Sequence, residues 1–404
     1  MITAAIVAEF NPLHNGHKYL INEVKRKLNA DRIIVIMSGD YVQRGEPAIL
    51  NKYTRANMAT LEGADLVLLL PTLYSLSGAD LFALSSVSIL DKLGCVDYLC
   101  FASECGDINL LDEICEKVNS NDYKISNDIK LLISQGMTYA RARATIFPEY
   151  SEVLDKSNNI LALEYIRAIK ALKSTIKPFT IKRLGKDYND SSVNNETNAS
   201  ATGLRSLLLK ETLSLDEIHS QIPEESFNFL KSLKDLPLVD LDMFSSEIYY
   251  SVLSNIDRLE NFLDVSDALS NKIRNNLMEF DKATDFIELL KTKDLTYSRL
   301  SRALMHILLN IELTADEARD SIDKLNHIRI LAMNKEAGDL TAAIKRNAKI
   351  ELITSVPKAS DNFNDVEDYL FKLDLKASTL YDHVVYKKYG IKPIHEYSKK
   401  FSTK

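Results

Sequence analysis

The chain has 404 residues, a net charge of −7 and ordinary apolar, charged and aromatic fractions. This length allows two or three domains with a large core, so the fold needs no disulfide or metal staple. The four cysteines, Cys95, Cys100, Cys105 and Cys115, fit no zinc spacing and contain no CxxC pair, so we expect buried, reduced thiols. The negative total charge does not indicate nucleic-acid binding, which could still be local.

The N-terminal stretch MITAAIVAEF has no basic region and no cleavage site, so it predicts a strand and not a signal peptide. The strongest apolar run, ADLVLLLP at 64–71, is far shorter than the roughly 20 residues that a membrane helix needs. We therefore expect a cytoplasmic protein with no membrane partner.

Strand-like and helix-like segments alternate through the first half of the chain. The strand-like runs are 3–10, 32–39, 64–71 and 96–103, and the helix patterns between them are 16–29, 50–62 and 78–93. Such alternation predicts an α/β fold with a doubly wound parallel sheet. Residues 108–175 look mostly helical, FTIKRLG at 179–185 predicts one more strand, and the polar stretch 186–200 predicts a loop.

The second half has a different pattern. From about 212 to 345, apolar residues recur at a spacing of three to four, which predicts helices. IELITSV at 350–356 could form a strand, and the last fifty residues look helical. We therefore expect an α/β domain over residues 1–210, followed by a mainly α-helical region over 211–404.

Two of the seven histidines, His14 and His17, stand around Gly16 between the first strand and the first helix. Parallel sheets bind ligands at the carboxyl ends of their strands, and a helix N-terminus attracts anions. Gly16 lets the backbone approach a ligand, and two imidazoles can donate hydrogen bonds to phosphate. The pattern predicts stabilisation of pyrophosphate as it leaves an α-phosphate. A structural histidine pair and a metal site are the alternatives, although no third metal ligand is evident.

The pattern His-x-Gly-His after a first strand resembles the signature of the nucleotidylyltransferase superfamily, whose Rossmann-like fold holds ATP or CTP. SATGLR at 200–205 resembles its second phosphate-binding element, since Ser200 and Thr202 can cap a helix and Arg205 lies one turn on. Stretches along the whole chain together resemble the tRNA(Met) cytidine acetate ligase family. They are AIVAEFNPLHNGHKYLI, MSGDYVQRGEPAILNKYTRANMA, GADLVLLLP, LCFASE, SNNILALEYIRAIK, IKRLGKDYND, SATGLR and, at 328–340, IRILAMNKEAGDL.

The resemblance implies a ligase that activates acetate with ATP and then acetylates N4 of the wobble cytidine of elongator tRNA-Met. ATP implies Mg²⁺ as its companion ion. His14 and His17 are the implied catalytic residues, acting on the phosphates. The implied ATP-binding residues are Val7, Ala8, Glu9, Phe10, Asn11, Pro12, Leu13, His14, Asn15, Gly16, His17, Lys18, Tyr19, Leu20, Ala102, Asn158, Arg183, Leu184, Thr202 and Arg205.

At two positions in this set the match to the family's residues is not simple. Asn159 is the alternative to Asn158, because the register is uncertain by one residue. Ala102 stands where the family has glycine, and its methyl group could push the adenosine outward or be absorbed.

Basic residues near aromatic ones suit a tRNA surface. Residues 124–186 hold twelve Lys and Arg against five acidic residues, with Arg141 and Arg143 beside Tyr139. Residues 386–404 carry six lysines and one glutamate. Arg44, in the polar loop at 38–49, could contact tRNA, or the loop could close over acetate. Solvated helix faces and an ordinary turn are the alternatives.

Two other functions fit parts of the pattern: adenylyl transfer to a small phosphorylated acceptor, and non-catalytic binding of a nucleotide or RNA. The sequence does not identify the residues that recognise acetate, a protein ligand for Mg²⁺, or an oligomeric state.

Overall fold

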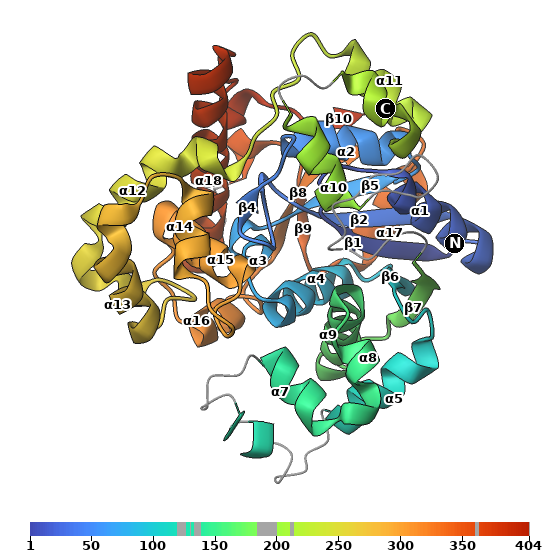
Figure 1. Ribbon diagram of the computed structural model, residues 1–404. Coiled ribbons are helices and arrows are strands. Elements are labelled where there is room, and N and C mark those ends of the chain that lie inside the picture. The colour runs from blue at the N-terminus through green and yellow to red at the C-terminus, as the bar shows by residue number, and fades with distance from the viewer. Residues whose placement is uncertain are drawn as a thin grey trace.

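The computed structural model describes residues 1–118, 127–129, 131–132, 139–183, 200–210, 214–359 and 363–403, with the backbone alone at 139–141 and 358. A mostly parallel sheet lies at its centre, in the strand order β10-β8-β5-β2-β1-β6-β7, with β9 paired to β8 (Figure 1). The strands are β1 Thr3–Ala8, β2 Arg32–Ser38, β5 Leu66–Leu70, β6 Tyr98–Ser103, β7 Lys177–Lys182, β8 His327–Met333, β9 Glu351–Ile353 and β10 Ser402–Thr403. The predicted α/β fold with a doubly wound parallel sheet is confirmed, except that β8 runs antiparallel to β5.

The central strands are apolar throughout because helices cover both faces of the sheet. Alternate residues of β2 enter different cores: Ile34 and Ile36 pack on one face, and Ile33 and Val35 on the other. The helices of the first half are α1 Asn15–Leu28, α2 Lys52–Leu61, α3 Thr72–Ser75, α4 Ala79–Leu93, α5 Ile108–Val118, α7 Tyr139–Ile146, α8 Ser151–Leu154, α9 Ser157–Ala171 and α10 Ala201–Leu208. A small hairpin, β3 Tyr41–Val42 and β4 Glu46–Pro47, follows β2.

The second half is mainly helical, as expected, but the expectation of helix at 327–333 is wrong. These residues form β8, which pairs with β5 in the antiparallel direction. The run HIRILAM is apolar or buried nearly throughout, and periodicity cannot separate a buried strand from a buried helix. The helices are α11 Glu224–Ser232, α12 Ser245–Ser254, α13 Asp267–Asn276, α14 Ala283–Leu290, α15 Tyr297–Leu309, α16 Ala315–Asp320, α17 Gly338–Asn347 and α18 Asp365–Tyr389.

The second half also completes the sheet of the first. β8, β9 and β10 extend the sheet beyond β5, and β9 confirms the strand expected within 350–356. Strands from both sides of residue 210 therefore share one sheet, and the division into two domains there stays a prediction. Within the described part of the chain, no helix is long and apolar enough to cross a membrane. The four cysteines are free thiols, and Cys100 and Cys115 are buried.

Buried charges tie the C-terminal segment to the end of β2. Lys52 Nζ donates to Asp40 Oδ2 at 2.7 Å, Ser378 Oγ at 2.6 Å and Glu396 Oε1 at 3.0 Å, and Arg329 Nη2 donates to Glu396 Oε2 at 2.7 Å. We call these five residues the Lys52 cluster. Burial raises the pKa of Glu396, but Lys52 and Arg329 outweigh it and hold that pKa below its usual value. Because Asp40 directly precedes β3, the cluster holds the start of the β3–β4 hairpin in place.

Candidate functional site

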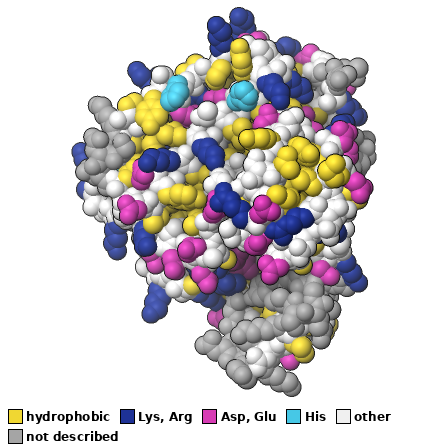
Figure 2. Space-filling model, turned by 90° about the vertical axis from the view of Figure 1, so that its left-hand side faces the viewer, with side chains coloured by type: hydrophobic (Ala, Val, Ile, Leu, Met, Phe, Trp, Pro, Cys, Tyr) yellow, Lys and Arg dark blue, Asp and Glu magenta, His cyan; other side chains and the backbone are white. Residues whose placement is uncertain are grey.

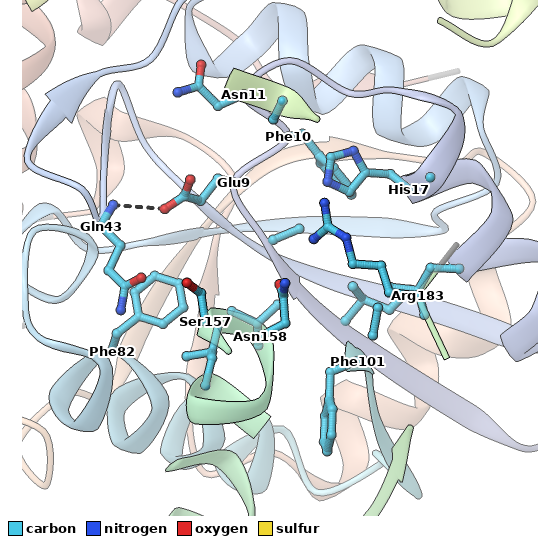
Figure 3. A pocket seen from close by; sticks show the side chains of 18 of the residues that line it. Glu9, Phe10, Asn11, His17, Gln43, Phe82, Phe101, Ser157, Asn158 and Arg183 are labelled. Atoms are coloured by element: carbon cyan, nitrogen blue, oxygen red, sulfur yellow. Dashed lines mark hydrogen bonds between the residues drawn. The ribbon is translucent and has the colours of Figure 1, made fainter. Parts of the chain in front are cut away.

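A cavity of about 380 Å³ opens at the carboxyl ends of β1, β6 and β7. In Figure 3, His17 and Arg183 lie on one side of it, Gln43 and Phe82 lie on the other, and Glu9 projects between them. Fourteen of the predicted site residues line this cavity. They are Val7, Ala8, Glu9, Phe10, Asn11, His14, Gly16, His17, Tyr19, Leu20, Arg44, Ala102, Asn158 and Arg183.

The two histidines cap α1 and fix each other. The backbone N–H of Gly16 donates to His14 Nδ1 at 3.0 Å, and the backbone N–H of His14 donates to His17 Nδ1 at 3.2 Å. Their rings stack with centroids 3.9 Å apart. Because each Nδ1 accepts a hydrogen bond, each neutral ring carries its proton on Nε2, which is then a donor. A Cβ at residue 16 would lie 2.9 Å from His14 Cε1, so Gly16 leaves room for the imidazole as well as for a ligand.

The surroundings keep both imidazoles neutral. Burial, followed by the charge of Arg183, lowers the pKa of His14 to about 3. Burial also lowers the pKa of His17 well below its usual value, with smaller effects from His14 and Arg183. At neutral pH the histidines can therefore donate hydrogen bonds to an anion, while Arg183 supplies positive charge at that side of the cavity.

The SATGLR segment lies against the turn between β1 and α1. Ser200 caps α10 by accepting the backbone N–H of Gly203 at 3.1 Å. Arg205 Nη1 donates to the backbone oxygen of Asn11 at 2.9 Å, and its Nη2 donates to Thr202 Oγ1 at 3.3 Å. The two elements that the sequence pairs as phosphate-binding are thus adjacent, although Thr202 and Arg205 lie just behind the cavity wall.

The structure separates the two neighbouring asparagines. Asn158 lines the cavity and donates to Glu104 Oε1 at 2.6 Å. Asn159 is buried, and its Oδ1 accepts the backbone N–H groups of Glu104 and Cys105. Of the two, Asn158 therefore faces the cavity, and Asn159 holds the loop after β6.

Several predicted ATP-binding residues lie away from the cavity. Pro12 and Leu13 are buried, Asn15 donates to the backbone oxygen of Ser220 at 2.8 Å, and Lys18 pairs with Glu62 at 2.8 Å. Leu184 lies outside the described residues, as does most of the loop expected at 186–200.

The predicted tRNA contact at Arg143 is corrected. Its side chain is buried, and Nη1 lies 3.0 Å from Glu164 Oε1, so its guanidinium does not face a partner at the surface. The basic pattern is visible in the sequence, but the sequence does not show that Glu164 on α9 faces Arg143. The side chain of Arg141 lies outside the described residues.

Sequence reasoning missed one side of the cavity. Gly78, Ala79 and Phe82 come from the start of α4, and Ser298 and Arg302 come from α15. No local motif marks these residues, because their common position depends on how α15 packs against the first half.

Comparisons with known proteins agree with this geometry. Residues 1–395 match the model of the HIGH Nucleotidyl Transferase family. The chain is 35% identical over 394 residues to the tRNA(Met) cytidine acetate ligase of Clostridium perfringens, covering 94% of this chain and 95% of that protein. It is 37% identical over 398 residues to the enzyme of that name from Clostridium kluyveri, covering 94% of both. The chain belongs to the tRNA(Met) cytidine acetate ligase family.

Solved structures extend the match to the whole fold of this family. The crystal structure of Thermotoga maritima TmcAL in its apo form I gives a TM-score of 0.91 at 26% identity, covering 100% of this chain and 99% of that one. The form II structure, bound with alpha-thio ATP, gives 0.88 at 26% identity and covers 100% of both chains. The tRNA(Met) cytidine acetate ligase family and the Rossmann-like nucleotidylyltransferase fold expected from the sequence are both confirmed.

Proposed function

We propose that the protein is an ATP-dependent tRNA(Met) cytidine acetate ligase. Acetate attacks the α-phosphate of ATP and releases pyrophosphate, and the wobble cytidine of elongator tRNA-Met then takes the acetyl group on N4, releasing AMP. The observation that carries this proposal is the contact of Arg205 with the backbone of Asn11, which joins the two phosphate-binding elements beside one cavity. Because ATP and tRNA are the substrates, we place the reaction in the cytoplasm.

The adenylation step needs little acid or base chemistry. Acetate is already a nucleophile, so positioning and stabilisation of charge on the leaving pyrophosphate carry the step. His14 and His17 donate through Nε2 and stay neutral, since their pKa values lie far below neutrality. Arg183 adds the positive charge that two neutral rings lack.

Mg²⁺ fits this site as an ion held mainly by the phosphates. Glu9 is the one carboxylate among the described residues that line the cavity. No group of three or more His, Cys, Asp or Glu in the described chain could hold a metal by itself. Mg²⁺ often keeps several waters and binds through substrate phosphates with one carboxylate, which would be Glu9. The ion would supply further neutralisation of the phosphate charge.

The tRNA surface is proposed on Arg44 and Arg141, together with Lys387 and Lys388 at the end of α18. Both lysines are exposed, although Lys387 lies 3.1 Å from Glu247 and Lys388 lies 3.9 Å from Asp240. Figure 2 shows the face on which α12, α13 and α18 lie, and there basic and acidic side chains are mixed without a continuous basic field. Lys399, expected in a basic tail, is instead paired with Asp382 at 2.7 Å and Glu396 at 3.0 Å. The C-terminal contribution to tRNA binding is therefore smaller than the count of lysines indicates.

The test is ATP–pyrophosphate exchange by the purified protein with and without acetate, followed by detection of N4-acetylcytidine in elongator tRNA-Met. We expect exchange that requires acetate and acetylation that requires both substrates. Exchange that requires a phosphorylated acceptor instead of acetate would establish the adenylyltransferase alternative. Tight ATP binding with no exchange, in the presence of bulk tRNA, would establish a non-catalytic binding protein.

A further inference from the structure

The cavity has a second side that the two phosphate-binding elements do not reach. Gln43 and Phe82 lie across from His17 and Arg183 (Figure 3). Arg302 belongs to this second side, because its Nη1 donates to the backbone oxygen of Gln43 at 3.4 Å and its side chain lines the cavity. We call the side of the cavity that carries His14, His17 and Arg183 the phosphate side. A helix from the second half of the chain thus places a cation across from it.

Arg302 is held rigidly. Its Nε donates to Asp264 Oδ2 at 3.1 Å, so Asp264 and Gln43 together use two of its five N–H donors among the described contacts. Although burial alone would raise it, the pKa of Asp264 is lowered by His306 and Arg302, which keeps this ion pair charged. A guanidinium fixed on one edge can present the other edge to a planar carboxylate.

The helix that carries Arg302 is also fixed. Ser301 Oγ donates to the backbone oxygen of Gly45 at 2.7 Å, and the two ring nitrogens of His306 lie 2.8 Å and 2.9 Å from the backbone oxygens of Leu263 and Leu76. Gly45 has a φ of +81°, and a Cβ there would lie 2.2 Å from the backbone nitrogen of Arg302. The polar loop after β2 therefore packs directly on the α15 backbone, which sets the geometry of this side of the cavity.

The remaining wall is small and apolar. Gly78, Ala79 and Phe82 line it from the start of α4, a helix of 15 residues whose N-terminal N–H groups and dipole favour an anion. Glu9 lies between this wall and the phosphate side, and the N–H of Gln43 donates to its Oε1 at 2.9 Å.

The chemistry of adenylation assigns an occupant to this side. In phosphoryl and nucleotidyl transfer the attacking and leaving oxygens lie roughly in line. Since pyrophosphate leaves toward the histidines, the attacking carboxylate has to approach from the opposite side, where Arg302 lies. We infer that Arg302 binds the acetate carboxylate, and that Ala79 and Phe82 enclose its methyl group and limit the length of the acid.

The bond changes balance without a proton transfer. One carboxylate oxygen forms a bond to the α-phosphorus, and the bond from that phosphorus to the α,β-bridging oxygen breaks. The electron pair leaves with pyrophosphate. Arg302 thus binds and orients acetate through the carboxylate oxygen that does not attack. It neither gains nor loses a proton in the step.

This inference rests on the proposed function, and its first test measures exchange against acetate concentration for wild type, Arg302→Gln and Arg299→Gln. Loss of a charged hydrogen-bond donor raises the KM for acetate of Arg302→Gln about 10- to 100-fold. ATP binding in the absence of acetate, measured by equilibrium titration, changes less than about 2-fold because the phosphate side is untouched. Arg299, on the same helix and outside the cavity lining, is the matched control and should keep the wild-type KM.

A second variant separates acid recognition from folding. Phe82→Ala should raise the ratio of kcat/KM for propionate or butyrate to that for acetate about 10-fold, since one methylene in an apolar pocket commonly discriminates by that much or more. The ratio is taken on a single enzyme sample, so a lower folded fraction does not change it.

The outcomes distinguish the two proposals. Wild-type exchange with acetate, combined with an unchanged acetate KM in Arg302→Gln, overturns the acetate subsite and leaves the ligase function standing. A change confined to the KM for tRNA overturns it as well and makes Arg302 a tRNA contact. Absence of wild-type exchange with any carboxylate, with tRNA present, overturns the function and the subsite together.

Discussion

The Lys52 cluster and the phosphate side of the cavity are both built from buried polar side chains near the carboxyl ends of strands. In the Lys52 cluster the charged groups pair with one another: Lys52 faces Asp40, and Arg329 faces Glu396. At the phosphate side the Nδ1 atoms of His14 and His17 accept backbone N–H groups, which leaves each Nε2 able to donate to a ligand. The same edge of one sheet thus carries polar groups that pair within the protein and polar groups that, in the proposed function, bind the phosphates of ATP.

The largest effect should come from opening the Lys52 cluster. Lys52→Met leaves the carboxylates of Asp40 and Glu396 buried without their shared cation. Removal of one partner from a buried ion pair costs about 3–5 kcal/mol in the free energy of unfolding. Chemical denaturation measures this loss. Lys372→Met, which removes an exposed i,i+4 partner of Asp368 on α18, is the control and should leave stability nearly unchanged. If both variants lost the same free energy of unfolding, the cluster would contribute no more to stability than an exposed ion pair does.

The phosphate side should respond in activity more than in stability. His17→Ala removes one Nε2–H donor to the leaving pyrophosphate, and loss of such a donor lowers the rate about 10²- to 10³-fold. Acetate-dependent pyrophosphate exchange measures it. His219→Ala, at a half-exposed histidine paired with Glu224, should exchange at the wild-type rate. A reduction below tenfold in His17→Ala would argue that the imidazole does not contact the phosphates.

Acidification should affect the two regions in different pH windows. The pKa of His14 is about 3 in the folded protein and near 6.5 in the unfolded chain, so the unfolded chain binds more protons between these values. Its contribution to stability is complete above pH 6.5 and is lost as pH falls toward 3. Glu396, whose folded pKa is lowered from 4.5, loses its contribution only below about pH 4.5.

Denaturation curves between pH 7 and pH 5 test this order. His14→Asn retains a good helix cap and should reduce the loss of stability in that range. The Lys52 cluster should contribute nothing to the slope there, so Glu396→Gln should lower stability by a constant amount. The expectation would be wrong if the slope of stability against pH disappeared in Glu396→Gln and persisted in His14→Asn. Glu396, and not His14, would then control the loss of stability in this range.

The smallest effect should come from Ala102→Gly, which introduces the glycine that the family resemblance implies at a position lining the cavity. Removal of one methyl group should lower the KM for ATP on the order of 2-fold, with a small loss of stability from glycine in a strand. A KM that rises would show that the methyl group of Ala102 packs against the nucleotide and does not obstruct it.

The sequence predicts that the histidines of the phosphate side lie together, because they are close to one another along the chain. His14, Gly16 and His17 lie in one turn, and the strand before them and the helix after them have clear patterns. The family resemblance supplies Arg205, and the structure brings it to Asn11.

The other features depend on distant parts of the chain. Lys52 and Glu396 are separated by 344 residues, and neither has a pattern that indicates the other. Arg302 reaches the cavity from a helix whose Ser301 packs against the distant Gly45, and the buried Arg143 pairs with Glu164 on another helix. β8 is hidden in a continuous apolar run. Local periodicity contains no information about these pairings.

The position of Glu396 has a consequence for synthesis on the ribosome. Asp40 and Lys52 leave the exit tunnel early, whereas Glu396 follows 344 residues after Lys52. At cellular rates of translation this interval lasts about 20–70 s. Until Glu396 is made, Lys52 lacks one of its two carboxylate partners, and β8 cannot pair with β10 before residues 402–403 are made. The buried charge cluster and this edge of the sheet can therefore be completed only after residues 396–403 have been made.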